Sequence, residues 1–175
     1  MNTRTEIEGL FTFQCEYSTL PALTPEQRAD VENQLKIRYF STGTQHKPTK
    51  QEQKWGIKRI YPDGAYWFNF KQRLPEIIEV LKDDPNSNRA VIVIDCRYQP
   101  PCYPFFQWKI CRNPPDKVFE NHLDLTCFAR SLDLKEGLPV DAHIFWKAGL
   151  EPVVKALGLE AGTLRIVSIG AHKYG

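Results

Sequence analysis

The sequence DCRYQPPCYPFFQW, residues 95–108, presents a cysteine between rigid segments. Prolines at positions 100, 101 and 104 keep the middle of this stretch out of regular secondary structure. The apolar runs at residues 91–94 and 105–110 flank it, and both predict buried β-strands. Cys102 is therefore expected at a strand edge, in a turn that proline stiffens. This arrangement suits a positioned nucleophile, and it equally suits a packed turn.

The composition indicates one globular domain spanning residues 1–175. The formal net charge is +2 at pH 7, so bulk charge does not favour a nucleic-acid polymer or a membrane as partner. The N-terminus lacks the apolar run of a signal peptide, and no stretch reaches membrane-spanning length. The five cysteines form no Cys-x-x-Cys pair, which favours reduced thiols over a disulfide framework. We therefore expect a cytoplasmic protein.

Three segments carry the signals of a helix. Thr24 and Gln27 form a capping box around a proline at the first helical position. Apolar residues recur with helical spacing over residues 74–83, with Pro75 in the first turn. Asp141 is expected to cap a further helix that begins at the next residue.

Strand signals alternate with these helices. A short apolar run at residues 10–13 predicts a first strand. Residues 123–130 alternate between apolar and polar side chains, a period of two that predicts a strand with unlike faces, and residues 137–139 break the pattern. Residues 163–169 predict a last buried strand. Because the order lacks βαβ regularity, we predict an α+β fold with a mixed or antiparallel sheet packed with helices.

Cys102 is the first candidate for chemistry. A cysteine attacks as its thiolate, so a functional one needs nearby positive charge and some exposure. Arg89, Arg97 and Arg130 are the available cations, all at expected strand ends or turns. The alternative is a small buried apolar side chain, which describes most free cysteines.

Two further clusters carry polar groups. Arg130, Ser131 and Asp133 offer a guanidinium fork and a hydroxyl at a strand end, which suit a phosphate, or else a surface ion pair and a turn. His172 and Tyr174 are two residues apart in an expected strand, where their side chains point the same way. They suit a sugar hydroxyl, or else a frayed terminus. No spacing of His, Cys and carboxylate residues indicates a metal site.

Four motifs together resemble the thymidylate synthase family. They are NSNR at 86–89, PCYPFFQ at 101–107, RSLD at 130–133 with GLPVD at 137–141, and HKY at 172–174. They follow the family's order at about its spacing, and the resemblance is clearest over residues 74–174. By this resemblance, Cys102 is the nucleophile that adds to C6 of a pyrimidine ring. Arg130 and Ser131 hold the nucleotide phosphate, and Arg130 also favours the Cys102 thiolate. Arg89 reaches the phosphate of a partner subunit, which implies a homodimer.

The remaining roles follow from the same resemblance. His172 and Tyr174 bind the ribose, Asp133 supports the base and Gln107 lines the site. The family's one-carbon donor is 5,10-methylenetetrahydrofolate, and family members continue beyond the position of Tyr174 with a tail that closes over folate.

Several positions depart from the family pattern. Asp141 stands where the methylase has an Asn that reads the uracil edge, and a carboxylate accepts a hydrogen bond from the amino group of cytosine. The family branch that hydroxymethylates cytidine nucleotides also has Asp there. Tyr103 replaces a histidine, and Asn88 replaces one of two adjacent phosphate-binding arginines.

Three hypotheses follow. The first is a thymidylate-synthase-like transferase that hydroxymethylates C5 of CMP or dCMP through a Cys102 adduct. The second keeps the nucleotide site but performs C5 chemistry without folate. The third is a nucleotide-binding module without catalysis. The combination of Cys102, Arg130 and Asp141 favours chemistry over binding alone.

Overall fold

The computed structural model describes residues 4–35, 65–94, 102–111 and 121–174. Arg97, one of the cations expected near Cys102, lies outside these ranges. No helix in the described ranges is long and apolar enough to cross a membrane.

A five-stranded sheet forms the centre of the described structure, in the order β2-β7-β5-β4-β3. Strands β3, β4 and β5 pair antiparallel in succession, β5 pairs with β7 in parallel, and β2 pairs with β7 antiparallel. The strands are β2 (Phe11–Cys15), β3 (Val91–Val93), β4 (Phe105–Cys111), β5 (His122–Ala129) and β7 (Glu160–Ser168). The mixed sheet and its helices confirm the predicted α+β class.

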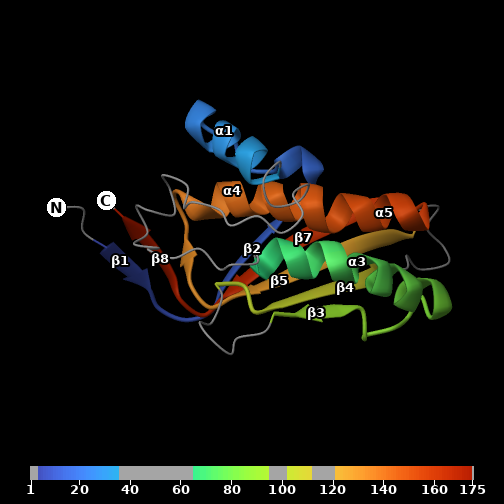
Figure 1. The fold of residues 1–175 in the computed structure, drawn as a ribbon. Coiled ribbons are helices and arrows are strands. Elements are labelled where there is room, and N and C mark those ends of the chain that lie inside the picture. The colour runs from blue at the N-terminus through green and yellow to red at the C-terminus, as the bar shows by residue number, and fades with distance from the viewer. Residues whose placement is uncertain (1–3, 36–64, 95–101, 112–120, 175) are drawn as a thin grey trace.

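A smaller, three-stranded sheet lies at one end of the large sheet (Figure 1). Its strands are β1 (Arg4–Ile7), β8 (Ala171–Tyr174) and β6 (Leu132–Asp133), in that order. The strand expected at residues 10–13 is β2, and β1, which precedes it, was not expected. Gly9 lies between them with a φ of 87°, a backbone conformation that favours glycine and that turns the chain from one sheet to the other.

The helices lie on one side of the large sheet, with α1 beyond α4 (Figure 1). A π-helical segment, Phe145–Leu150, joins α4 to α5. Pro152 lies in the first turn of α5, just after the π-helical segment. The helices are α1 (Pro25–Gln34), α3 (Ala65–Asp83), α4 (Gly137–Ile144) and α5 (Glu151–Leu157), with a 3-10 turn at Tyr17–Thr19.

The capping box of α1 is confirmed. The backbone N–H of Gln27 donates to Thr24 Oγ1 at 3.2 Å, and the backbone N–H of Thr24 donates to Gln27 Oε1 at 3.0 Å. Two of the otherwise unpaired amides at this helix end are therefore satisfied by local side chains.

Two helix boundaries differ from the prediction. Helix α3 begins at Ala65, so Pro75 lies inside the helix and not in its first turn. Helix α4 begins at Gly137, so Asp141 lies within it and does not cap it, and residues 137–139 start a helix after the strand. The chain enters α4 through a turn that the Asp133 side chain holds, as described below.

The inner face of the large sheet carries the core. The alternating residues of β4 and β5 that point to the helices are almost fully buried, and Trp108 Nε1 donates to Gly149 O of the π-helical segment at 3.0 Å. This bond fixes the helices over β4 through a buried polar group that is satisfied. The inward-facing set on β4 and β5 comprises Phe106, Trp108, Ile110, Leu123, Leu125, Cys127 and Ala129.

The outer face of the large sheet is not covered by any described element. Its side chains alternate with the core residues and are half-buried or exposed, among them Gln107 and Lys109 on β4 and Thr126 on β5. Val93 is 55% exposed and Phe128 is 39% exposed on the same face, which is a high exposure for large apolar side chains.

Candidate functional site

Cys102 lies just before β4, whose first residue, Phe105, pairs with Phe128 near the end of β5. The backbone N–H of Arg130, which follows β5, donates to Cys102 O at 2.6 Å. The predicted nucleophile and the predicted phosphate-binding arginine are therefore tied together through the backbone. Both side chains are exposed.

The described cysteines differ in exposure and in pKa. Burial raises the pKa of the Cys15 thiol to about 11, and burial with the charge of Asp141 raises the pKa of Cys127 well above its usual value. Both thiols therefore stay protonated near neutral pH. Cys102 is exposed and so has the access to solvent that a nucleophile needs.

Tyr103 connects this segment to helix α4. Its hydroxyl donates a hydrogen bond to Asp141 Oδ2 at 2.7 Å, and its ring packs edge-on against Phe145 with a centroid separation of 4.6 Å. Burial raises the pKa of the Tyr103 phenol well above its usual value, and the charge of the Asp141 carboxylate raises it further. The Tyr103 hydroxyl therefore stays protonated and can donate this hydrogen bond. Because Tyr103 directly follows Cys102 in the chain, the bond ties the Asp141 carboxylate to the segment of the candidate nucleophile. In the sequence, Tyr103 stands out only as a departure from the family pattern. Its position directly after Cys102 is the signal that could have marked it as a site residue.

Asp133 shapes the turn that leads into α4. Its Oδ1 accepts hydrogen bonds from the backbone N–H groups of Lys135 at 2.9 Å and Glu136 at 3.1 Å. The side chain is 8% exposed. These contacts give Asp133 a structural role in positioning α4, and through α4 it positions Asp141.

His172 lies on β8 beside the turn that carries Arg130 and Ser131. It pairs in parallel register with Asp133, and its backbone O accepts from Leu134 N at 2.9 Å. The His172 side chain is buried, whereas Ser131 is half-buried. The structure therefore brings part of the predicted phosphate cluster and part of the predicted sugar cluster onto adjacent strands.

Gly170 allows this close approach. A Cβ on Gly170 would lie 2.8 Å from the backbone O of Arg130, closer than a side chain permits. Tyr174 pairs in register with Arg4 of β1, so the predicted strand at the C-terminal end is confirmed as β8.

Two predicted site residues lie elsewhere. Gln107 is on the outer face of β4, and its Nε2 donates to Asn88 O at 3.2 Å. Arg89 precedes β3 and is exposed. Gln107 and Arg89 therefore share the edge of the uncovered face, whereas Tyr103 and Asp141 meet on the helix-covered side.

The sequence matches no family model and no curated protein. Among solved structures, the chain is similar to thymidylate synthase from T4 phage, with a TM-score of 0.65 and 23% sequence identity. The match covers 94% of this chain and 66% of the phage enzyme, so the chain spans slightly less than two thirds of that protein's length. Its α+β architecture is therefore a thymidylate-synthase fold.

Proposed function

We propose that this chain is an enzyme that modifies C5 of a pyrimidine nucleotide through a covalent Cys102 adduct. The observation that carries the proposal is the backbone link of exposed Cys102 to Arg130, beside the Tyr103–Asp141 pair. The shared fold with a phage thymidylate synthase supports the reaction class.

The first chemical step needs only residues of this chain and the nucleotide. The Cys102 thiolate adds to C6 of the ring, and the electron pair of the C5–C6 double bond moves toward C5 and, in cytosine, the conjugated C4–N3 bond. C5 becomes nucleophilic and can exchange its hydrogen or attack an electrophile. Expulsion of Cys102 from C6, with loss of the proton from C5, then restores the double bond.

Arg130 and Ser131 are the proposed phosphate ligands. A guanidinium presents paired N–H donors that match phosphate oxygens, and a hydroxyl adds a further donor. The same positive charge favours the thiolate form of Cys102. His172 and Tyr174 on β8 are the proposed ribose ligands, because β8 adjoins the Arg130 turn through β6.

Asp141 is proposed to select cytosine. Tyr103 donates to one carboxylate oxygen, which orients the group and supports its ionised form. An ionised carboxylate only accepts hydrogen bonds, so it complements the 4-amino donor of cytosine and opposes the 4-carbonyl of uracil. The substrate that follows is CMP or dCMP, and the finer proposal is hydroxymethyl transfer.

The implied one-carbon donor, methylenetetrahydrofolate, is a cosubstrate. The described residues identify no pterin-binding group, so we assign to them nucleotide binding, adduct formation and control of the C5 proton alone.

A homodimer is proposed to complete the site. The uncovered face carries exposed Val93 and Phe128, and Arg89 and Gln107 lie along its edge. Packing two such faces together removes apolar area from water and places Arg89 within reach of the partner's phosphate site.

Release of tritium from C5 of cytidylate into water tests the proposed chemistry without any one-carbon donor. Exchange supports an enzyme that forms the C6 adduct. Tight nucleotide binding without exchange supports the non-catalytic module instead.

A further inference from the structure

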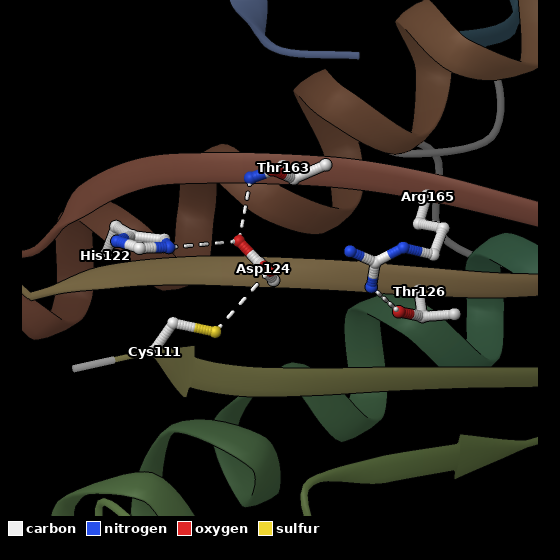
Figure 2. Close-up of polar contacts among 6 residues, drawn as sticks. All are labelled: Cys111, His122, Asp124, Thr126, Thr163 and Arg165. Carbon is white, nitrogen blue, oxygen red and sulfur yellow. Dashed lines mark hydrogen bonds and ion pairs between the residues drawn. The ribbon is translucent and has the colours of Figure 1, made fainter. Parts of the chain in front are cut away.

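Three potential metal ligands meet at the other end of the large sheet. Cys111 is the last residue of β4 and His122 is the first of β5, and the two are directly opposite each other in the antiparallel register. Asp124 follows His122 on the same face of β5 (Figure 2). One donor atom from each of these three side chains lies within 4.8 Å of the other two. The cluster was not anticipated, because it depends on strand register and not on spacing along the chain.

A β-bulge shapes this cluster. The pairing of β5 with β7 shifts between Leu123, which faces Ala161, and Leu125, which faces Leu164. The extra residue on β7 brings the Thr163 N–H to Asp124 Oδ1 at 2.8 Å (Figure 2). Bulges commonly redirect side chains at functional sites, and this one fixes the orientation of the Asp124 carboxylate.

Gly162 in the same bulge makes the space for two of these side chains. A Cβ on Gly162 would collide with both the Asp124 carboxylate and the His122 ring. His122 and Asp124 therefore lie directly over a backbone that has no side chain of its own. The position accepts only glycine as long as the two side chains stay together.

We propose that Cys111, His122 and Asp124 bind one divalent cation of the zinc class, with water as the fourth ligand. Thiolate, imidazole and carboxylate are the donors that zinc takes in proteins, at about 2.0–2.3 Å in tetrahedral geometry. Donor atoms around such an ion are about 3.3–3.6 Å apart, from those bond lengths. His122 Nε2 is 3.6 Å from Asp124 Oδ1, and Cys111 Sγ is 3.5 Å from Asp124 Oδ2. Small rotations of these three side chains would bring their donor atoms to bonding distance from one ion.

The charge balance of the cluster also suits a divalent cation. Without metal, the Cys111 thiol donates to the Asp124 carboxylate, and metal binding replaces that proton. A thiolate and a carboxylate then neutralise two positive charges. The neighbouring cations direct their hydrogen bonds to neutral groups outside the cluster: Lys109 Nζ donates to Asn86 O and Asn88 Oδ1, each at 2.7 Å, and Arg165 Nη1 donates to Thr126 Oγ1 at 3.4 Å.

The ion's role is structural. Cys111 ends β4 and Cys102 precedes it, so the two are separated by the length of this seven-residue strand, about 20 Å at about 3.4 Å per residue. The cation therefore lies away from the proposed nucleotide site and fastens the ends of β4 and β5 at the bulge of β7. The cluster lies on the outer sheet face with Lys109 and Thr126, at the end away from Cys102, and the inference does not rest on the proposed chemistry.

Cobalt(II) titration of the chelator-treated full-length chain tests the site. We expect one equivalent to bind, with a thiolate-to-cobalt charge-transfer band and the visible bands of a four-coordinate ion, both removed by zinc. Cys111→Ser should abolish the charge-transfer band, and Asp124→Asn and His122→Gln should each weaken binding by at least about tenfold. Cys102→Ser and His143→Gln are the matched controls, and both should keep the full signal.

Two results would overturn the site. One is the absence of the charge-transfer band in the native chain at excess cobalt. The other is a band that survives Cys111→Ser and disappears in Cys102→Ser, which would assign it to the exposed thiol. If Cys111→Ser does not fold, Asp124→Asn decides, since its amide oxygen still accepts from Thr163; full-strength cobalt binding in that variant contradicts the proposal.

Discussion

The hydroxyl of Tyr103 donates to Asp141 Oδ2 at 2.7 Å, which joins the segment of the candidate nucleophile to helix α4. The tyrosine is 4% exposed and its pKa is held well above the usual value by burial and by the Asp141 charge. This pair links two sites that the proposal needs together: the thiol that attacks the base and the carboxylate that selects it.

Removing the Tyr103 hydroxyl should destabilise the fold. Tyr103→Phe leaves the ring packing against Phe145 intact but removes a hydrogen bond to a charged group. We expect a loss of about 1–3 kcal/mol in the free energy of unfolding, measured with urea. Tyr17→Phe is the matched control: Tyr17 is 64% exposed, and its change should stay within about 0.5 kcal/mol. Equal stabilities of the native chain and Tyr103→Phe would contradict this role for the bond.

Asp141 should set the preference for the base. We expect the native protein to bind CMP or dCMP more tightly than UMP or dUMP by about 1–3 kcal/mol. Asp141→Asn should shift the preference toward uracil, because an amide can donate to the 4-carbonyl. Calorimetry with the four nucleotides measures both effects. Equal affinity of the native protein for CMP and UMP would remove Asp141 from base recognition.

Cys102 should be the most reactive of the described thiols. Cys102 is exposed, whereas burial raises the pKa of the Cys15 thiol to about 11 and holds the pKa of the Cys127 thiol well above its usual value. Iodoacetamide near pH 7 should therefore label Cys102 first, and bound nucleotide should protect it. Labelling of Cys15 should keep rising until the pH reaches about 11, since deprotonation follows its raised pKa. Faster labelling of Cys15 or Cys127 at pH 7 would contradict the assignment, with peptide mass spectrometry as the readout.

The uncovered sheet face should mediate a homodimer. Phe128→Glu places a charge on the exposed apolar part of that face and should convert the dimer to a monomer, measured by light scattering at micromolar concentration. Lys155→Glu, on the exposed side of α5, is the control that should remain dimeric. A strictly monomeric native protein would remove Arg89 from the proposed site.

Local signals predicted several elements well. The Thr24 capping box and the alternation along β5 depend on neighbouring residues only, and both are found in the structure. The start of α4 was placed too late: the helix begins at Gly137, after a turn in which Asp133 Oδ1 accepts from the amides of Lys135 and Glu136, and Asp141 lies inside it. An Asp spaced like a cap can also lie inside a helix, and the sequence pattern alone does not separate the two cases.

The candidate site, too, was predicted from the sequence only in part. The order of motifs identified the segments that carry Cys102 and Arg130, and the structure ties them by a backbone hydrogen bond. The outward direction of Gln107 follows from the pleat of β4, and the cluster at Asp124 follows from a register shift in β7. Such placements depend on how distant strands pair, and residue spacing does not contain them.

The most direct test of the central claim is exchange of tritium from C5 of cytidylate, measured in the native chain, Cys102→Ser and the control Cys15→Ala. Formation of the C6 adduct makes the C5 hydrogen acidic, so the native chain and the control should release tritium into water. Cys102→Ser should release none while its nucleotide affinity stays within about tenfold, roughly 1.4 kcal/mol. Exchange at the native rate in Cys102→Ser would contradict the covalent mechanism.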